Sequence, residues 1–176
     1  MKNNNAAATH TWKQKTPVGT LIISAGPTGV TSVLLNGSMK AAGRDAPASA
    51  TPPAQRAIAR AFDRYFAGDA HALDGLQVDL SGVQSDFHRR VLTTLRALAG
   101  PGTTLSYGEL AAVVGHPGAA RAVGSVMARN PVPIILPCHR VLASDGTLGG
   151  YGGGLEMKRS LLRIEGVDLA APKRRS

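Results

Sequence analysis

The stretch SYGELAAVVGHPGAARAVGSVMARN, residues 106–130, decides how the carboxy-terminal half of the chain folds. Ser106 is followed three residues later by Glu109, which is the spacing of a capping box at the start of a helix. Gly115 ends that helix, and after a short His-Pro-Gly turn a second helix carries Arg121. Two short helices joined by a tight Gly/Pro turn are typical of a helix-turn-helix unit.

The basic charge of the chain favours a polyanionic partner. Of the 176 residues, 20 are Lys or Arg and 11 are Asp or Glu, which gives a net charge of +9. Fourteen of the 20 are arginines, whose guanidinium groups suit bidentate contacts with phosphate. Nucleic acid is one interpretation, and a merely basic surface, to which the KRRS terminus contributes, is the other. Together with the helix-turn-helix pattern, the positive charge favours DNA as the partner.

The composition excludes several classes of protein. A hydrophobic fraction of 43% is enough for a packed core, so the chain is not disordered as a whole. No apolar run approaches the roughly 18 residues of a membrane span, and MKNNNAAATH lacks the apolar part of a secretory signal. One cysteine forms neither an internal disulfide nor a cysteine-rich zinc site. We therefore expect a cytoplasmic protein with no membrane partner.

The first 83 residues predict a small α/β unit. The sequence TLIISAGPTGVTSVLL, residues 20–35, places a Gly-Pro-Thr-Gly turn between two β-rich runs, which indicates strand, turn and strand. Residues 37–53 predict a loop, a helix follows from Pro53, and LQVDL at 76–80 alternates like a short strand. The apolar face of the helix is interpreted as core and not as a cofactor site; it comprises Ile58, Ala61, Phe62, Tyr65 and Phe66.

Two more helices complete the carboxy-terminal half. SDFHRRVLTTLRALAG, residues 85–100, offers Ser85 or Asp86 as the N-cap and stops at Gly100-Pro101. LEMKRSLLRIEG, residues 155–166, predicts the last helix, and the residues after it predict a frayed basic tail.

The only cysteine, Cys138, lies in PIILPCHRVLASDGTLGGYGGG, residues 133–154. A lone cysteine is commonly a small buried hydrophobic residue. Here Pro137 predicts an extended approach to it, and His139 and Arg140 are unusual core residues. A neighbouring imidazole or cation lowers the pKa of a thiol and makes it a nucleophile. Because neighbouring side chains of extended backbone point to opposite faces, His139 acts on Cys138 through a water molecule or not at all.

The glycine-rich stretch GTLGGYGGG, residues 146–154, is not a phosphate-binding loop. It lacks the G-x-x-x-x-G-K-[ST] order and the strand-loop-helix frame of a dinucleotide motif. Glycines let the backbone approach a ligand closely. A glycine-rich wall with one tyrosine, Tyr151, suits a pocket for a flat ring beside the thiol, and an ordinary surface loop is the alternative.

The motifs SYGELA, GAARAVG, NPVPIILPCHRV, GGYGGG, KRSLL and EG occur in the order and spacing of the O6-alkylguanine-DNA alkyltransferases, and from about Asp86 to Gly166 the sequence resembles that family. The resemblance implies an α/β plus α fold. A small amino-terminal α/β domain, ribonuclease H-like, is expected at 1–83, and a mostly helical, helix-turn-helix alkyltransferase domain at 84–168, before a basic tail at 169–176. Some relatives bind zinc through amino-terminal cysteines, which this chain lacks, so no metal is expected.

The resemblance also implies the roles of five residues around the thiol. Cys138 accepts the alkyl group, His139 takes the thiol proton through a bridging water, and Glu165 orients that histidine. Tyr107 protonates or hydrogen-bonds N3 of guanine as the base leaves. Asn130 ties the second helix of the helix-turn-helix unit to the cysteine segment.

Substrate and DNA contacts follow from the same resemblance. Tyr151 lines the alkyl pocket, the amide of Gly152 donates to O6, and the carbonyls of Cys138 and Val141 accept from the exocyclic amine. Arg121 is a finger that enters the duplex where the damaged nucleotide has been flipped out. Met127 is also expected to bind the substrate. The residues expected to contact DNA besides Arg121 are Ala120, Ala122, Gly124 and Arg140.

The function implied is direct reversal of DNA damage by a monomer that needs no cofactor. The alkyl group of O6-alkylguanine in double-stranded DNA, and of O4-alkylthymine if it is accepted, moves once and irreversibly to Cys138. One alternative is a lesion-binding sensor or regulator that transfers nothing. Another is a cysteine hydrolase, which regenerates its thiol where an alkyltransferase reacts only once.

Overall fold

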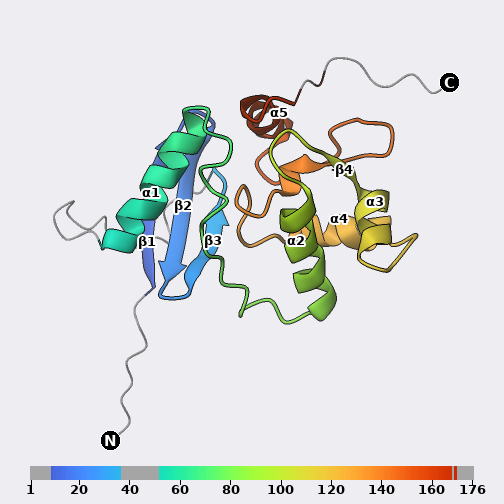
Figure 1. Ribbon diagram of the computed structural model, residues 1–176, viewed down its shortest axis with the longest axis horizontal. Coiled ribbons are helices and arrows are strands. Elements are labelled where there is room, and N and C mark those ends of the chain that lie inside the picture. The colour runs from blue at the N-terminus through green and yellow to red at the C-terminus, as the bar shows by residue number, and fades with distance from the viewer. Residues whose placement is uncertain (1–8, 37–51, 168, 170–176) are drawn as a thin grey trace, which may run out of the picture.

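The computed structural model describes residues 9–36, 52–167 and 169 (Figure 1). It is built from a three-stranded sheet with one covering helix, followed by four further helices. Most of the loop predicted at 37–53 and nearly all of the basic tail predicted after residue 168 lie outside the described residues.

An antiparallel sheet in the order β1-β2-β3 forms the amino-terminal part. Its strands are β1 (His10–Thr16), β2 (Gly19–Gly26) and β3 (Gly29–Leu34), so the predicted strand-turn-strand unit is confirmed and β1 is added to it. The strand predicted at 76–80 is wrong. Only one parallel bridge, Val30 to Val78, joins that segment to β3, because it leaves the sheet edge immediately.

Helix α1 (Pro53–Phe66) covers this sheet (Figure 1). Proline stands at its first turn, where an amide hydrogen bond is not needed. The predicted apolar face is buried at Ile58, Ala61, Phe62 and Tyr65, and Phe66 is partly buried against the same core.

The first helices of the carboxy-terminal half begin at the residues that their capping signals predict. Ser85 caps α2 (Asp86–Leu98) by accepting a hydrogen bond from the amide of His88. Ser106 and Glu109 form a reciprocal capping box on α3 (Tyr107–Val113). The turn then leads into α4 (Ala120–Ala128), the second helix of the unit, which packs against both α2 and α3.

The cysteine segment follows α4 and leads to a strand that pairs with the residues just before α3. β4 (Leu105–Ser106) pairs in parallel with β5 (Val141–Leu142), and β5 comes directly after the short 3₁₀ helix η2 (Cys138–Arg140). Helix α5 (Leu155–Ile164) then packs against η2. The pairing fixes the start of α3 beside the end of the cysteine turn, so Tyr107 and Cys138 are brought together by backbone hydrogen bonding.

One continuous hydrophobic core runs through both parts of the chain, from Trp12 in the sheet to Leu161 in α5. The amide of Val33 on β3 also donates to the carbonyl of Pro131, 2.9 Å away, just before the cysteine segment. The sheet therefore packs against the segment that carries Cys138, and the two parts of the chain share one core.

We expect the Ser106→Ala variant to unfold at lower urea concentration, with a free energy of unfolding lower by about 1 kcal/mol, because the capping box that starts α3 is lost. The matched control is Ser125→Ala, an exposed position inside α4 where alanine favours helix. Equal stability of the two variants would contradict this role of the cap.

Candidate active site

Cys138 opens a 3₁₀ turn and does not sit in extended backbone as predicted. The amide of Arg140 donates to the carbonyl of Pro137 at 2.9 Å, and that of Cys138 to Leu136 at 2.8 Å. The thiol side chain is buried, with 6% of the residue exposed. Because the chain turns here, the side chains of Cys138 and His139 need not point to opposite faces, as they would in an extended strand.

The approach to the cysteine is a strained, tightly bonded turn. Ile134 has φ of 76°, a conformation that a β-branched residue rarely adopts, and its side chain is buried. Asn130, at the end of α4, donates from Nδ2 to the carbonyl of Leu136 at 2.8 Å and accepts from the amide of Val132 at 3.0 Å. One amide side chain therefore joins the second helix of the helix-turn-helix unit to the segment before Cys138.

His139 and Glu165 form a buried pair behind the thiol. Nε2 of His139 lies 2.8 Å from Oε1 of Glu165, and neither side chain is exposed to solvent. Within the described part of the chain, Nδ1 of His139 is buried and has no hydrogen-bond partner. Burial lowers the pKa of His139 although Glu165 acts in the opposite direction, so the imidazole is neutral and has one nitrogen available to take a proton.

Glu165 stays ionised because hydrogen bonds outweigh its burial. Burial raises the pKa of this carboxyl, but donors from His139 and Arg140 bring it down to about 2. Arg140 donates from Nε to Oε2 at 2.7 Å and from Nη2 to Oε1 at 2.9 Å, and its Nη1 donates to the carbonyl of Ala99. Tyr65 adds a further bond from its hydroxyl to Oε1 at 2.6 Å.

The expectation that Arg140 contacts DNA needs correction. Its guanidinium group is buried and is committed to Glu165 and to a main-chain carbonyl. A side chain held in this way does not face a ligand outside the protein. We assign Arg140 to the support of Glu165.

Burial raises the pKa of the Cys138 thiol above its ordinary value, and the opposing effects of Asn130 and Lys158 are smaller. The sequence predicted the reverse, a thiol pKa lowered by its neighbours. The resting site is therefore a neutral thiol beside a neutral imidazole. A thiol in this state needs a base at the moment of reaction, which makes the His139–Glu165 pair more important.

Two tyrosines stand beside the thiol. The ring of Tyr107 packs against the backbone of Gly149, where a β-carbon would come within 3.2 Å of the tyrosine hydroxyl. The rings of Tyr151 and His139 meet edge to face with centroids 6.5 Å apart. Burial, and then the charge of a Cys138 thiolate, raises the pKa of both phenols, so both remain protonated as hydrogen-bond donors.

The sequence prediction missed Lys158, which holds the glycine-rich stretch in place. It lies on α5 and is fully buried, and its Nζ donates to the carbonyls of Val141 at 2.6 Å, of Leu148 and of Gly150 at 3.5 Å. Burial lowers its pKa to about 8, against the opposing effect of Cys138. The carbonyl of Val141, expected to accept from the base, therefore already accepts one hydrogen bond and keeps one lone pair.

The other four predicted DNA-contacting residues, Arg121, Ala120, Ala122 and Gly124, lie along α4. Arg121 and Ala122 are exposed, while Ala120 is partly buried. Gly124 faces Tyr107, whose ring would be 4.0 Å from a β-carbon there. Met127 is buried in the core beneath the helix.

The expected amide donor at Gly152 is open to approach. This glycine is exposed, and a β-carbon placed there would meet no atom within 4 Å.

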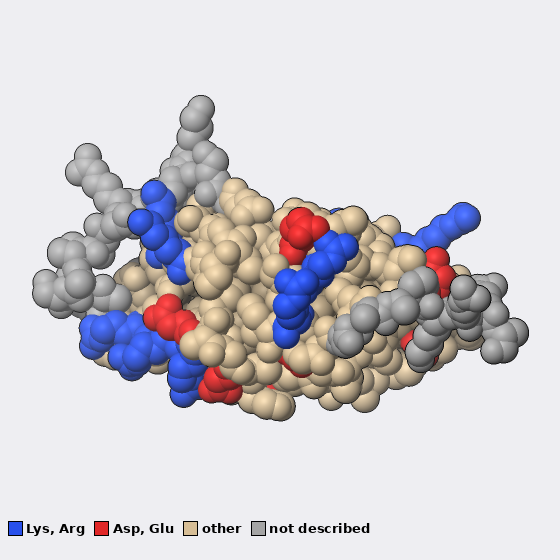
Figure 2. All heavy atoms as spheres, turned by 90° about the horizontal axis from the view of Figure 1, so that it is seen from above, with Lys and Arg blue, Asp and Glu red and all other residues tan. Residues whose placement is uncertain are grey.

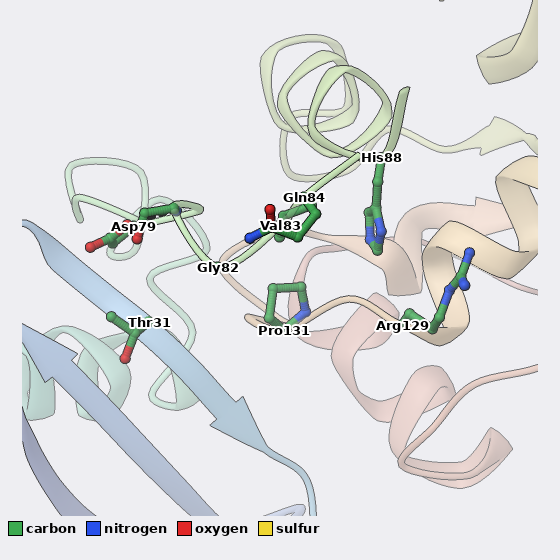
Figure 3. A pocket seen from close by; sticks show the side chains of 9 residues that line it. Thr31, Asp79, Gly82, Val83, Gln84, His88, Arg129 and Pro131 are labelled. Atoms are coloured by element: carbon green, nitrogen blue, oxygen red, sulfur yellow. Dashed lines mark hydrogen bonds between the residues drawn. The ribbon is translucent and has the colours of Figure 1, made fainter. Parts of the chain in front are cut away.

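A hollow of about 470 Å³ lies between the sheet and the helices (Figure 3). His88 on α2 and Arg129 at the end of α4 line one side of it, with Thr31 on β3 and Asp79 across from them. No predicted site residue lines this hollow.

Charge does not single out a binding face in the view from above. Figure 2 shows Lys and Arg side chains dispersed among Asp and Glu on that face, without a single basic patch. Among the described residues, no group of three or more His, Cys, Asp or Glu side chains is arranged to hold a metal ion. Over the same residues, no helix has the length and apolar character to cross a membrane.

Comparison with known proteins places this chain in a family. Residues 86–167 match the family described as 6-O-methylguanine DNA methyltransferase, DNA binding domain. A methylated-DNA–protein-cysteine methyltransferase of Mycobacterium leprae is 42% identical over 159 residues, covering 89% of this chain and 92% of that protein. The chain belongs to the methylated-DNA–protein-cysteine methyltransferase family.

Other members of the family share its sequence and fold. A methylated-DNA–protein-cysteine methyltransferase of Mycolicibacterium paratuberculosis is 48% identical over 62% of this chain, a match that spans 66% of that protein. The crystal structure of Mycobacterium tuberculosis OGT in complex with DNA has a TM-score of 0.72 at 37% identity, covering 89% of this chain and 92% of that one. The α/β plus helical fold described above is therefore the fold of the methyltransferase family.

We expect Lys158→Met to release the glycine-rich stretch. Amide hydrogen exchange of residues 148–151, followed by mass spectrometry, should speed up roughly tenfold or more, because three carbonyls lose their shared donor. The control is Arg159→Met, which removes only a surface ion pair with Glu156. Identical exchange of this stretch in both variants would refute the anchoring role.

Acid should destabilise the protein in two stages. The neutral, buried His139 resists protonation, so below its ordinary pKa of 6.5 the unfolded chain binds more protons and stability begins to fall. Glu165, with a folded-state pKa of about 2 against an ordinary 4.5, stabilises fully above 4.5 and loses this effect as pH falls toward 2. Urea unfolding should show a loss of roughly 2 kcal/mol or more between about pH 7 and about pH 3. A free energy of unfolding that does not change between these pH values would contradict a neutral His139 and an ionised Glu165 in the folded protein.

Proposed function

We propose that this chain repairs alkylated DNA by moving the alkyl group of O6-alkylguanine to Cys138. The observation that carries the proposal is the buried thiol backed by the His139–Glu165 pair, with Nδ1 of His139 free of protein partners among the described residues. Membership of the methyltransferase family supports it. We extend the proposal to O4-alkylthymine as a second substrate.

The net reaction forms one carbon–sulfur bond, breaks one carbon–oxygen bond and moves one proton from the thiol to the departing guanine. The sulfur of Cys138 attacks the alkyl carbon, and the bond from that carbon to O6 breaks as the carbon–sulfur bond forms. His139 takes the thiol proton through a bridging water, while Tyr107 gives its proton to N3 of the departing guanine and regains one from the imidazolium. The net products are S-alkylcysteine and unmodified guanine, so each protein molecule reacts once.

We propose that α4 presents the damaged nucleotide to the site. Arg121 is exposed on this helix and would enter the duplex where the nucleotide is flipped out, a step that costs a few kcal/mol in stacking and pairing. Small residues at Ala120, Ala122 and Gly124 let the helix approach a minor groove closely. Asn130 couples the end of this helix to the cysteine segment.

The finer architecture belongs to the same proposal. We propose that residues 1–83 form a ribonuclease H-like domain and residues 84–168 the alkyltransferase domain, with a basic tail at 169–176. The sheet covered by α1 supports the first part. We propose the cytoplasm as the place of action, where an unpaired cysteine stays reduced, and a monomer as the acting species.

Mass spectrometry of the peptide containing Cys138 tests the proposal. After incubation with duplex DNA that contains O6-methylguanine, we expect one added methyl group per protein molecule and no turnover. The Cys138→Ala variant should bind the same DNA and acquire no methyl group. An unmodified peptide after prolonged exposure would favour the lesion sensor, and a regenerated thiol with repeated turnover would favour the hydrolase.

A further inference from the structure

One side chain of the amino-terminal part, Tyr65, contacts the residues proposed to transfer the thiol proton. Tyr65, in the last turn of α1, is 1% exposed, and its hydroxyl donates to Oε1 of Glu165 at 2.6 Å. The same oxygen accepts from His139 at 2.8 Å. Helix α1 therefore contacts the carboxylate that orients the catalytic base, across 100 residues of sequence.

Packing alone does not account for this hydroxyl. The ring of Tyr65 meets Phe66 edge to face with centroids 5.2 Å apart, and its body fills the core as phenylalanine would. A buried hydroxyl costs free energy unless it is hydrogen-bonded. Burial, followed by the charge of Glu165, raises the pKa of Tyr65, so the phenol keeps its proton and acts only as a donor to Glu165.

The position of the Glu165 carboxylate depends on how its donors balance. Arg140 contacts both carboxylate oxygens and is the charged partner, so it draws the group toward itself. Tyr65 and His139 bond only Oε1. Without the hydroxyl, the carboxylate is free to turn toward Arg140, which lengthens its contact with His139.

Other titratable groups near Tyr65 do not replace its hydroxyl. Tyr151 interacts with it only electrostatically. A cavity of about 240 Å³ lies against both Tyr65 and Arg140, and the charged or titratable side chains that complete its lining are His71, Asp74 and Arg96.

We propose that Tyr65 is a positioning residue for deprotonation of Cys138: its hydroxyl holds Oε1 of Glu165 in line with Nε2 of His139. The inference rests on the proposed function in taking His139 as the base for the thiol. Through Tyr65, the amino-terminal part of the chain would then affect the rate of the reaction as well as the packing of the core.

The test is Tyr65→Phe, which removes one oxygen and keeps the ring. Because the chain has a single cysteine, alkylation by iodoacetamide reports on Cys138 alone and does not depend on DNA. Near neutral pH we expect alkylation and methyl transfer from O6-methylguanine DNA to slow roughly fivefold or more. The pH profile of alkylation should move upward by about half a pH unit or more, since a less well-held His139 is a weaker base. Affinity for undamaged DNA should not change.

Phe62→Leu is the matched control, because it disturbs the same buried face of α1 one turn away and leaves the hydroxyl in place. It should lower stability without moving the pH profile. An unchanged profile and rate in Tyr65→Phe, or a faster reaction, would overturn the proposal. If the wild-type protein transfers no methyl group but the iodoacetamide profile still shifts in Tyr65→Phe, the proposed function fails while Tyr65 retains its positioning role.

Discussion

The burial of one charged carboxylate governs the structure of this site. Glu165 is held by three side chains that come from the end of α1 and from the 3₁₀ turn at the cysteine. A buried ion pair that loses one partner destabilises a protein by about 3–5 kcal/mol, so Arg140 and Glu165 hold each other in place. The last turn of α5, the cysteine turn and the amino-terminal helix are fixed to one another at a single pair of oxygens. Arg140 extends the same network to the carbonyl at the end of α2.

The same burial sets the chemistry of the thiol. Because Cys138 is buried and its thiol pKa is raised, we expect it to react slowly with oxidants and alkylating agents, at a rate that depends on the base His139 provides. The site thus combines low reactivity at rest with a base that is already oriented. Lys158 contributes from α5, where its buried Nζ bonds the carbonyls of Val141 and Leu148 and so fixes the glycine-rich backbone. The proposed single reaction per molecule would favour a thiol that other electrophiles consume slowly.

Local signals in the sequence were enough to predict most helices and one hairpin. The caps at Ser85 and Ser106 and the Gly-Pro-Thr-Gly turn act within a few residues, so sequence alone reveals them. Strand β1 was missed because HTWKQKT is largely polar and buries only Trp12. The turn at Cys138 and the burial of Lys158 depend on distant partners. The family resemblance named the residues of the site, but whether Arg140 faces DNA or Glu165 was decided by three-dimensional packing.

The bond between Tyr65 and Glu165 also has a consequence for how the molecule is made. Helix α1 leaves the ribosome well before the last helix has been synthesised, and contacts of long sequence separation form late in folding. Until Glu165 arrives, His139 has no carboxylate to orient it and Cys138 has no prepared base. A growing or truncated chain therefore carries an ordinary cysteine. The reactive site forms only when the last helix has folded and Glu165 has bonded His139 and Tyr65.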